Sequence, residues 1–313
     1  MNVVGDAITD YLTWLSTHGY ATTTIKDRRH HLVALADFLE ERGITDPARV
    51  TPADVESYQR HLFHHRKSNG MALTFRTQAQ RLVPVKGFFS WLTGCGRLPY
   101  DPASALVLPR TEHRLPESTL SVDEVESVLA GPDTTTTLGI RDRAIMEVFY
   151  SSAIRRMELI ALRVADIDAS RGTLFVRQGK GGRDRHVPIG ERALHWVRRY
   201  NDEVRPRLAP SPDAGTLFLT SYGGSFAPDV LSRQVTAYMK AGAPAKRGSC
   251  HMFRHTTATL MLDAGADVRY VAEMLGHQKL ETTMIYTRVS LAKLSAVHAA
   301  CHPAENATRT TWL

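Results

Sequence analysis

The sequence has few cysteines and no long apolar run. Cys95, Cys250 and Cys301 are odd in number and lie far apart in a chain of 313 residues. They therefore provide no disulfide framework and fit a reducing compartment. The N-terminus, MNVVGDAITDYL, contains neither a basic segment nor a long apolar stretch. We accordingly expect no signal peptide, no membrane span and a cytoplasmic location.

The excess of positive charge is not concentrated in a tail. The formal net charge is +7 and the isoelectric point is about 9.4. Residues 1–110 contain 13 Lys and Arg against 10 Asp and Glu, and the remainder contains 26 against 22. A basic balance favours a polyanionic partner, although many basic proteins bind none. The even distribution suits two domains that grip nucleic acid better than a globule with a basic arm.

Residues 1–98 predict a helical domain, because apolar residues recur at helical spacing between glycines. A helix should begin at Thr51, where Pro52 suits the first turn and Asp54 lies near the positive helix end. From about Thr74 to Leu92, Pro84 predicts a kink or a break. A helical bundle without chemistry also explains this periodicity. The apolar faces comprise Ile8, Leu12 and Leu15, then Ile25, Leu32, Leu35 and Leu39, then Val55, Tyr58 and Leu62.

Residues 99–118 contain four prolines and no helical period, which predicts an extended linker. Residues 119–313 form the second predicted domain. A helix should begin at Ser121, which has capping-box spacing to Glu124. Short β-type runs, 173–177 and 186–189, flank GKGGRD and predict a hairpin with a glycine-rich turn. The fold class predicted for the chain is mainly α with a small β-sheet.

The stretch CHMFRHTTATLMLDAG places His251, Arg254 and His255 at helical spacing. With Cys250, the two histidines resemble part of a zinc site, but no fourth ligand stands at a recognisable spacing and HExxH does not occur. A phosphate site explains more of these residues. An arginine offers a planar fork of donors to two phosphate oxygens, and a nearby histidine adds a contact or moves a proton.

Two further motifs carry candidate residues. Lys180 lies among glycines in GKGGRDR, which is not a Walker loop. The motif is consistent with a hairpin turn bearing a solvated lysine, and also with a mobile hairpin that delivers a general acid. Farther on, LGHQKLETTMIYTRV contains His277 and Tyr286. Each residue alone would suggest ordinary packing. Together they complete a set of Arg, Lys, His and Tyr without an acidic cluster that could hold magnesium.

In order and separation, these motifs resemble the catalytic domain of tyrosine recombinases, the group that includes Xer proteins, lambda-type integrases and Cre. The resemblance covers residues from about 119 to 302, and the HxxRH motif with LGH followed nine residues later by Tyr is its most specific part. Residues 1–98 resemble the family's helical, SAM-like core-binding domain more weakly. The resemblance implies a C-shaped clamp of two domains around DNA.

By motif position, the resemblance implies a set of six catalytic residues. Arg156 is adjacent to the first catalytic arginine, but Arg155 places Glu158 and Leu159 in the family's register. Ala153 stands where the family usually has glycine. Met157 and Phe253 also depart from the pattern, which affects packing rather than chemistry. The implied catalytic residues are Arg155, Lys180, His251, Arg254, His277 and the nucleophile Tyr286.

The resemblance also implies a mechanism without metal or other cofactor. Tyr286 would form a 3′-phosphotyrosine while Lys180 protonates the departing 5′ oxygen, and a homotetramer on double-stranded DNA would pass through a Holliday junction. Such sites contain inverted-repeat core sequences, and a paralogous recombinase could share the work. The segment SLAKLSAVHAACHP suits a helix that packs on its own domain or docks into a neighbouring protomer. The protein would then be nucleoid-associated.

Three other functions remain open on the residues alone. A type IB topoisomerase shares much of this chemistry within one duplex. A DNA-binding regulator could retain the fold without catalysis, and a DNA-packaging protein would explain the charge but not the order of the motifs. Among recombinase roles, we expect integration or excision of a mobile element, with Xer-type resolution of chromosome or plasmid dimers as the alternative. Pro84, which is unexpected in the fourth helix, favours the mobile element.

Overall fold

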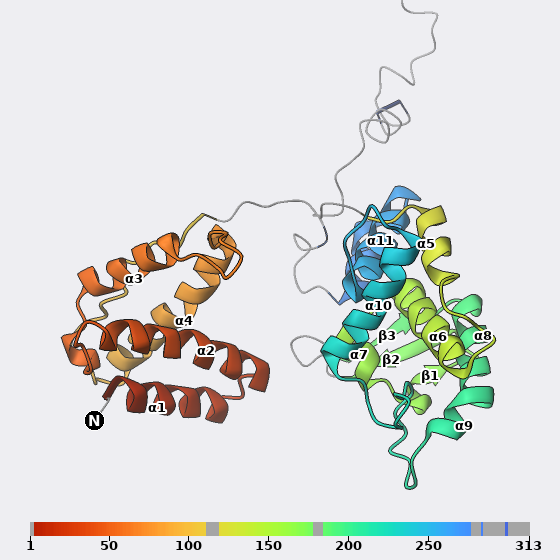
Figure 1. Ribbon diagram of the computed structural model, residues 1–313, viewed down its shortest axis with the longest axis horizontal. Coiled ribbons are helices and arrows are strands. Elements are labelled where there is room, and N and C mark those ends of the chain that lie inside the picture. Colours follow the sequence, from red (N-terminus) through yellow and green to blue (C-terminus); the bar gives the residue numbers. More distant parts are fainter. Residues whose placement is uncertain (1–2, 111–118, 178–183, 277–282, 284–297, 300–313) are drawn as a thin grey trace, which may run out of the picture. The chain divides into compact units, whose positions relative to one another are not determined.

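The chain divides into two compact units in the computed structural model (Figure 1). The N-terminal unit comprises Met1–His113 and the C-terminal unit Arg114–Leu313. The structure describes residues 3–110, 119–177, 184–276, 283 and 298–299. In these ranges no helix is long and apolar enough to cross a membrane.

Helices packed around one apolar core make up the N-terminal unit (Figure 1). Tyr11, Phe88 and Trp91 form an aromatic centre, with ring centroids 5.8 Å apart for Tyr11 and Phe88 and 5.4 Å for Tyr11 and Trp91. The helical domain predicted from periodicity is present, and Ile8, Leu12 and Leu15 are buried as one face. The elements are α1 (Val3–Thr17), α2 (Thr22–Glu40), a 3-10 turn (Pro47–Arg49), α3 (Pro52–His64) and α4 (Phe75–Gly94).

Local signals place the start of α3. Of the kink or break expected at Pro84, the break is absent, and the kink stays a prediction. Thr51 and Asp54 form a capping box, with Pro52 in the first turn. Helix α4 runs through Pro84 without interruption. The proline removes one backbone donor, but its ring is buried beside Val85 in the same helix face. Core packing along α4 therefore outweighs the local preference for a helix end.

The packed part of the N-terminal unit extends beyond Leu98, where the sequence analysis ended the first domain. Ala103 and Leu106 are buried in its core. Lys86 donates to the Leu106 carbonyl at 2.8 Å, and the Gln59 amide donates to the Val107 carbonyl at 2.9 Å. The proline-containing segment therefore begins as a strap across the first unit.

The C-terminal unit combines helices with a small antiparallel sheet in the order β1-β2-β3. Val176 pairs with Arg185 next to the loop that connects β2 and β3. The predicted pairing of the two strands is confirmed. Strand β1 was not predicted, because two residues are too few to show a periodic pattern. The described elements are α5 (Val122–Leu129), α6 (Thr137–Ser152), α7 (Arg156–Ala161), a 3-10 turn (Val164–Asp166), β1 (Ile167–Asp168), β2 (Thr173–Val176), β3 (Arg185–Pro188), α8 (Glu191–Arg199), a π-helical turn (Tyr200–Val204), α9 (Arg205–Leu208), α10 (Pro228–Gly242), α11 (Cys250–Asp263) and α12 (Val268–Leu275).

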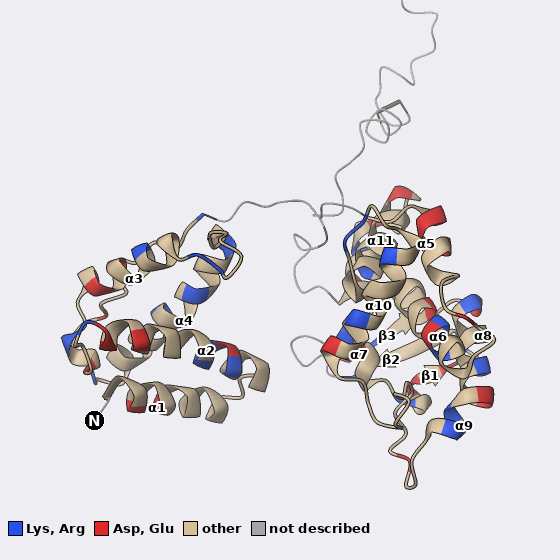
Figure 2. Ribbon diagram, in the orientation of Figure 1, with Lys and Arg blue, Asp and Glu red and all other residues tan. Residues whose placement is uncertain are grey.

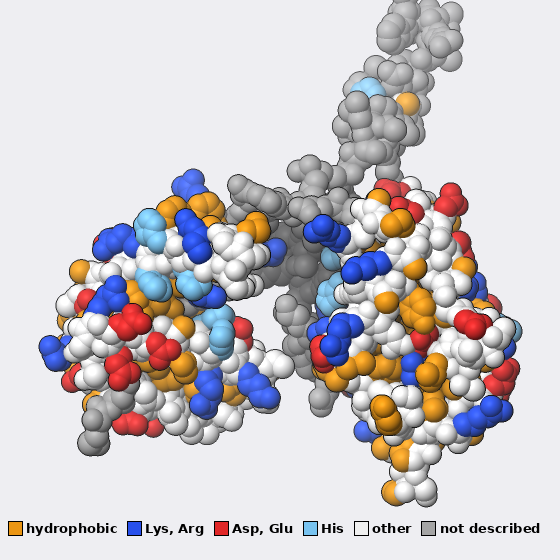
Figure 3. Space-filling model, in the orientation of Figure 1, with side chains coloured by type: hydrophobic (Ala, Val, Ile, Leu, Met, Phe, Trp, Pro, Cys, Tyr) orange, Lys and Arg blue, Asp and Glu red, His pale blue; other side chains and the backbone are white. Residues whose placement is uncertain are grey.

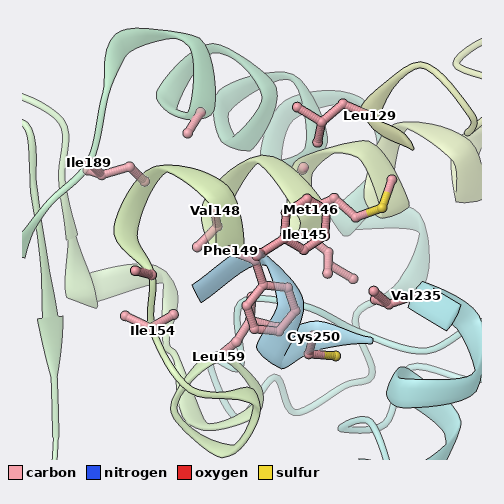
Figure 4. Packing of buried hydrophobic residues seen from close by; sticks show 14 of the residues in the cluster. Leu129, Ile145, Met146, Val148, Phe149, Ile154, Leu159, Ile189, Val235 and Cys250 are labelled. Atoms are coloured by element: carbon pink, nitrogen blue, oxygen red, sulfur yellow. The ribbon is translucent and has the colours of Figure 1, made fainter. Parts of the chain in front are cut away.

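Helix α6 is the centre of this unit. Val148 and Phe149 are fully buried, and Phe149 extends towards Leu159 and Cys250 (Figure 4). The Phe149 ring also stacks on Phe253 of α11, with centroids 6.4 Å apart. Burial of such large apolar side chains provides the main driving force for packing α6, α7 and α11 together. The end of α6 and the start of α7 are thereby held against α11.

Candidate active site in the C-terminal unit

Three of the six predicted site residues fall in the described part of the chain. Arg155 precedes α7, and His251 and Arg254 lie in the first turns of α11. Lys180, His277 and Tyr286 lie outside the described residues, as does most of the predicted C-terminal exchange helix. The strands before and after the Lys180 segment are described, as is Gly276, which precedes His277.

A sharp reversal of the backbone presents Arg155. Helix α6 ends at Ala153, which has φ 51° in the left-handed region. Glycine adopts this conformation more readily than other residues, which explains why the family usually has glycine at this position. Ala153 is fully buried and held by its surroundings. The next helix begins at once, with Arg155 as its N-cap residue.

Arg254 is a buried cation that donates to two backbone carbonyls. Its side chain is in α11, and the residue is 5% exposed. Nη1 donates to the Ala153 carbonyl at 2.8 Å, and Nη2 donates to the Leu275 carbonyl at 2.7 Å. These bonds tie the end of α6 to the end of α12 through one guanidinium group. Such planar fork geometry is what arginine provides and lysine does not.

Arg155 reaches the same turn at the end of α12. Its Nη2 donates to the Gly276 carbonyl at 3.3 Å, next to the Leu275 carbonyl that Arg254 contacts. Gly276 has φ 64°, which ends the helix in a left-handed conformation. Arg155 and Arg254 therefore both contact residues 275–276, although about a hundred residues separate them in the sequence.

Glu158 is a buried carboxylate that orients Arg155. Its Oε2 accepts from the Arg155 backbone N–H at 2.8 Å, and Oε1 accepts from Arg155 Nη1 at 2.9 Å. Arg185 of β3 adds a second fork, with 3.0 Å from Nη1 to Oε1 and 2.8 Å from Nη2 to Oε2. Burial alone would raise the pKa of Glu158, but the bonds from Arg185 and Arg155 outweigh it and lower this pKa to about 2.

Sequence reasoning used Glu158 to set the register, but assigned neither Glu158 nor Arg185 to the site. Their spacing along the chain carries no sign that they meet. A charged residue inside an otherwise apolar segment, such as Glu158 in RRMELIAL, was the available signal, because buried carboxylates are seldom left without a partner.

His251 has an environment that favours its neutral form. Loss of contact with water lowers the pKa of His251, and the nearby charges of Arg254, Arg156 and Arg155 lower it further. A neutral imidazole can accept a proton at neutral pH. The residue as a whole is exposed, so the ring remains open to a ligand.

Arg156 occupies a different environment from Arg155. Its Nη1 donates to the Ser232 hydroxyl of α10 at 2.5 Å, while its buried Nε has no hydrogen-bond partner among the described residues. Helix α10 also carries Arg233 and Lys240, and basic residues are visible along it in Figure 2. Of the two adjacent arginines, Arg155 is the one that shares Glu158 with Arg185.

The partial zinc motif does not assemble in the described residues. Cys250 is 1% exposed, and burial raises the pKa of its thiol to about 11, so the thiol stays protonated. Within the ranges that the structure describes, no three His, Cys, Asp or Glu side chains are grouped to hold a metal ion. Cys250 packs in the core beside Phe149 (Figure 4).

The surface of the N-terminal unit is rich in histidine. Pale blue side chains gather over α2 and α3 in Figure 3. The rings of His30 and His31 lie 5.2 Å apart, and those of His61 and His65 lie 6.1 Å apart. Basic and acidic residues are interspersed on the same helices (Figure 2). This unit therefore presents a mixed polar surface rather than a single basic patch.

The C-terminal cluster is suited to an anion that gains charge. Two guanidinium groups and an imidazole come together from two chain segments, the start of α7 and the first turns of α11, and backbone carbonyls and a buried carboxylate fix the two arginines. Donors held in place before a ligand binds need not reorganise during a reaction, which makes them effective at stabilising developing negative charge. Phosphoryl groups have the required charge and oxygen geometry.

Comparisons with known proteins agree on one family. The model of the phage integrase family matches residues 118–293. A protein named tyrosine recombinase XerC 2, from Ralstonia nicotianae, is 47% identical over 286 residues, which is 91% of this chain and 82% of the relative. Tyrosine recombinase XerD of Mycobacterium tuberculosis is 38% identical over 296 residues, covering 91% of this chain and 93% of the relative.

Solved structures show a similar fold. The XerH site-specific recombinase bound to palindromic difH substrate, in a post-cleavage complex, has a TM-score of 0.71 at 21% identity and covers 88% of this chain and 79% of that one. A lambda integrase tetramer bound to a Holliday junction has a TM-score of 0.66 at 16% identity, with coverage of 89% and 76%.

Proposed function

Since this chain belongs to the phage integrase family of tyrosine recombinases, and is thus a site-specific DNA recombinase, we propose that Tyr286 is its nucleophile and forms a 3′-phosphotyrosine. The observation that carries the proposal is the convergence of Arg155 and Arg254 on residues 275–276, directly before His277. Relatives that are 47% and 38% identical across most of the chain support the same chemistry.

Each proposed catalytic residue has a distinct task. Arg155, Arg254 and His277 bind the non-bridging oxygens of the scissile phosphate, where negative charge increases in the transition state. The neutral His251 accepts the Tyr286 proton, because an unperturbed tyrosine has a pKa of about 10 and is otherwise a weak nucleophile. The phenolate oxygen then bonds to phosphorus as the bond to the 5′ oxygen breaks. Lys180 protonates that leaving oxygen.

The reverse step joins strands. A 5′ hydroxyl from a second duplex attacks the phosphotyrosine, so the new phosphodiester forms as the bond to Tyr286 breaks. The number of phosphoester bonds is conserved, so the exchange needs no ATP, and Arg155, Arg254 and Lys180 supply the positive charge that a metal ion would otherwise provide. Two such exchanges, separated by a Holliday junction, require four protomers on two DNA sites.

We further propose that the two units clamp one duplex at inverted-repeat core sites and that four protomers assemble on two such duplexes. Support comes from the solved neighbours, since the XerH structure contains a palindromic substrate and the lambda integrase structure is a tetramer on a Holliday junction. The histidine-rich face of α2 and α3 (Figure 3) and the basic α10 (Figure 2) offer polar surfaces for backbone contacts.

For the biological role, we propose Xer-type resolution of chromosome or plasmid dimers. The two relatives described above are named XerC 2 and XerD, and the matches cover 91% of this chain and 82% and 93% of the relatives. The sequence had favoured integration or excision of a mobile element, partly on Pro84, but α4 accommodates Pro84 without interruption. The trapping assay described next can distinguish the Xer role from recombination of a mobile element.

A trapping assay tests the proposed chemistry. The full-length protein and Tyr286→Phe are incubated, in a metal-chelating buffer, with suicide duplexes made from the DNA flanking the gene and from chromosomal dimer-resolution sites. We expect an adduct that resists detergent with the wild type and none with the variant. Binding without an adduct on every duplex would contradict the proposed chemistry. Adducts confined to the flanking DNA would replace the Xer role by a mobile-element role.

A further inference from the structure

We propose that Arg185 is a positioning residue for catalysis, which couples the hairpin that carries Lys180 to the phosphate-binding arginines. Its guanidinium group lies where β3, the start of α7 and the end of α12 meet. The inference rests on the proposed function, because it assigns a role to a residue that touches none of the reacting atoms in that mechanism.

The first step is the link to Arg155. Both Arg185 Nη atoms donate to the Glu158 carboxylate, and the same carboxylate holds the backbone and side chain of Arg155. Glu158 is 5% exposed and Arg185 13% exposed in their side chains, so water screens this bridge little. A buried carboxylate shared by two arginines fixes the relative position of both.

The second step is the link to the segment before His277. Arg185 Nε donates to the Met274 carbonyl at 3.2 Å, at the end of α12. A Cβ added at Gly276 would lie 3.1 Å from Cζ and Nε of Arg185, so the guanidinium group packs against the glycine that ends the helix. Arg185 therefore contacts the same turn whose carbonyls accept hydrogen bonds from Arg155 and Arg254.

The third step is the link to Lys180. Arg185 is the first residue of β3 and pairs with Val176, the last residue of β2. The two ends of the connection that contains Lys180 are therefore anchored at the residue that also contacts Glu158. Because Arg185 joins three segments at once, its loss should relax the phosphate-binding groups and the base of the hairpin together.

A second arginine in the same unit provides a matched control. Arg205 of α9 donates through Nη1 and Nη2 to Asp213, at 2.8 and 2.9 Å, and through Nε to the Thr216 carbonyl at 3.0 Å. Its side chain is 11% exposed, close to the 13% of Arg185. Helix α9 packs on the Tyr200–Val204 turn, and in the described part of the chain Arg205 makes none of the hydrogen bonds of the candidate site. The two arginines form the same kind of fork with a carboxylate, but the fork of Arg205 lies away from the site and its partner Asp213 is more exposed than Glu158.

The experiment compares Arg185→Met, Arg185→Lys and Arg205→Met in the full-length protein. For each variant, the rate of covalent adduct formation is measured on a suicide duplex at saturating DNA, together with DNA affinity by mobility shift and the thermal midpoint. We expect Arg185→Met to form adduct about 10- to 100-fold more slowly, with affinity within about threefold of the wild type, as for removal of a group that orients a catalytic residue. Arg205→Met should keep the wild-type rate well below its thermal midpoint.

Two further readouts separate positioning from a purely structural role. Arg185→Lys retains the charge without the fork and should recover part of the lost rate. In Arg185→Met, Glu158 loses one cationic partner, so its pKa rises and the adduct rate should fall further at about pH 5.5 than at about pH 8. Because protonation of His251 slows the wild type as well, the comparison uses the ratio of the variant rate to the wild-type rate, which should be lower at about pH 5.5 than at about pH 8.

The outcomes are distinguishable. An Arg185→Met rate within about twofold of the wild type at saturating DNA would overturn the inference, as would equal losses in Arg185→Met and Arg205→Met. Wild type that binds but forms no adduct, under conditions in which Tyr286→Phe behaves identically, would instead remove the proposed function on which the inference rests.

Discussion

The two units of this protein are both helical, but they differ in what they bury. The described core of the N-terminal unit contains apolar and aromatic side chains with Gln78, and no charged residue is buried there. The described core of the C-terminal unit contains several buried charges, namely Arg141, Asp142, Glu147, Glu158, Asp166 and Arg254. Removing a charge from water is costly unless a partner compensates for it.

The buried charges show that polar contacts fix part of the geometry of the C-terminal unit. Arg254 and Glu158 join segments that apolar packing alone would leave free to adjust by small shifts. Directional bonds hold donors to within tenths of an ångström, which a phosphate site requires, whereas apolar contacts tolerate sliding. Not every buried charge serves the site. Asp142, for example, accepts from the Tyr238 hydroxyl at 2.8 Å and joins α6 to α10.

The largest effect should follow the loss of the Arg254 fork. Arg254→Lys keeps the charge but cannot donate to the Ala153 and Leu275 carbonyls together. We expect adduct formation to slow by about 100- to 1000-fold, the scale for removing one preorganised donor to developing charge. Suicide-duplex kinetics at saturating DNA measures the change.

An arginine of the N-terminal unit serves as the control for that substitution. Arg42 donates to the Phe38 carbonyl at 3.1 Å from the surface of its unit. Arg42→Lys should leave the adduct rate within about threefold of the wild type at saturating DNA. Similar losses for the two variants would contradict the difference drawn between the units.

The next effect concerns the pH dependence of stability. Although burial raises the pKa of Glu158, the bonds from Arg185 and Arg155 lower this pKa from its ordinary value of 4.5 to about 2 in the folded protein. The stabilisation is therefore fully present above about pH 4.5 and is lost as the pH falls through about 2, with a total of about 3 kcal/mol. Glu158→Gln lacks it. The difference in free energy of unfolding between wild type and Glu158→Gln, from urea titrations, should shrink as the pH is lowered through this window.

A constant difference between pH 7 and pH 2 would contradict that origin of stability. It would mean that the Glu158 carboxylate contributes through packing rather than charge. The matched variant is Glu56→Gln, because Glu56 forms an exposed pair with Arg60 on α3 and should alter stability little at any pH.

A smaller effect should be confined to the N-terminal unit. Phe88 is fully buried, and Phe88→Leu should lower the free energy of unfolding of that unit by about 1–2 kcal/mol. Because each unit has its own core, the transition of the C-terminal unit should not move. In a background with Trp196→Phe and Trp312→Phe, the fluorescence of Trp14 and Trp91 reports on the N-terminal unit. A parallel shift of the C-terminal transition, followed by far-ultraviolet dichroism, would show that the units unfold together.

The smallest effect is expected at Pro84. Pro84→Ala restores a backbone donor and improves helix propensity by about 3 kcal/mol, but it removes about two buried methylene groups worth about 1.6 kcal/mol. The net change should be a stabilisation of about 1 kcal/mol, measured by urea unfolding. Destabilisation instead would show that the proline ring fits a cavity that alanine leaves empty.

Sequence reasoning reached the fold class and the local starts of elements. The helix start at Thr51, the capping box at Ser121 and the pairing of β2 with β3 are as predicted, because the signals are contained within a few residues. The break at Pro84 was wrong because α4 is stabilised along its whole length by the core. The strap that contains Ala103 and Leu106 was not predicted. A segment without a periodic apolar pattern can still be buried by contacts with helices that are distant in sequence.

The sequence by itself determined the types and order of the candidate catalytic residues, since side-chain chemistry and motif spacing are read directly from the chain. Only the tertiary structure decided that Arg155 and Arg254 share one turn, and that Glu158 and Arg185 support it. Those contacts join residues that are far apart in sequence. They depend on how α6, α7, α11 and α12 pack, and no local pattern encodes the geometry of that packing.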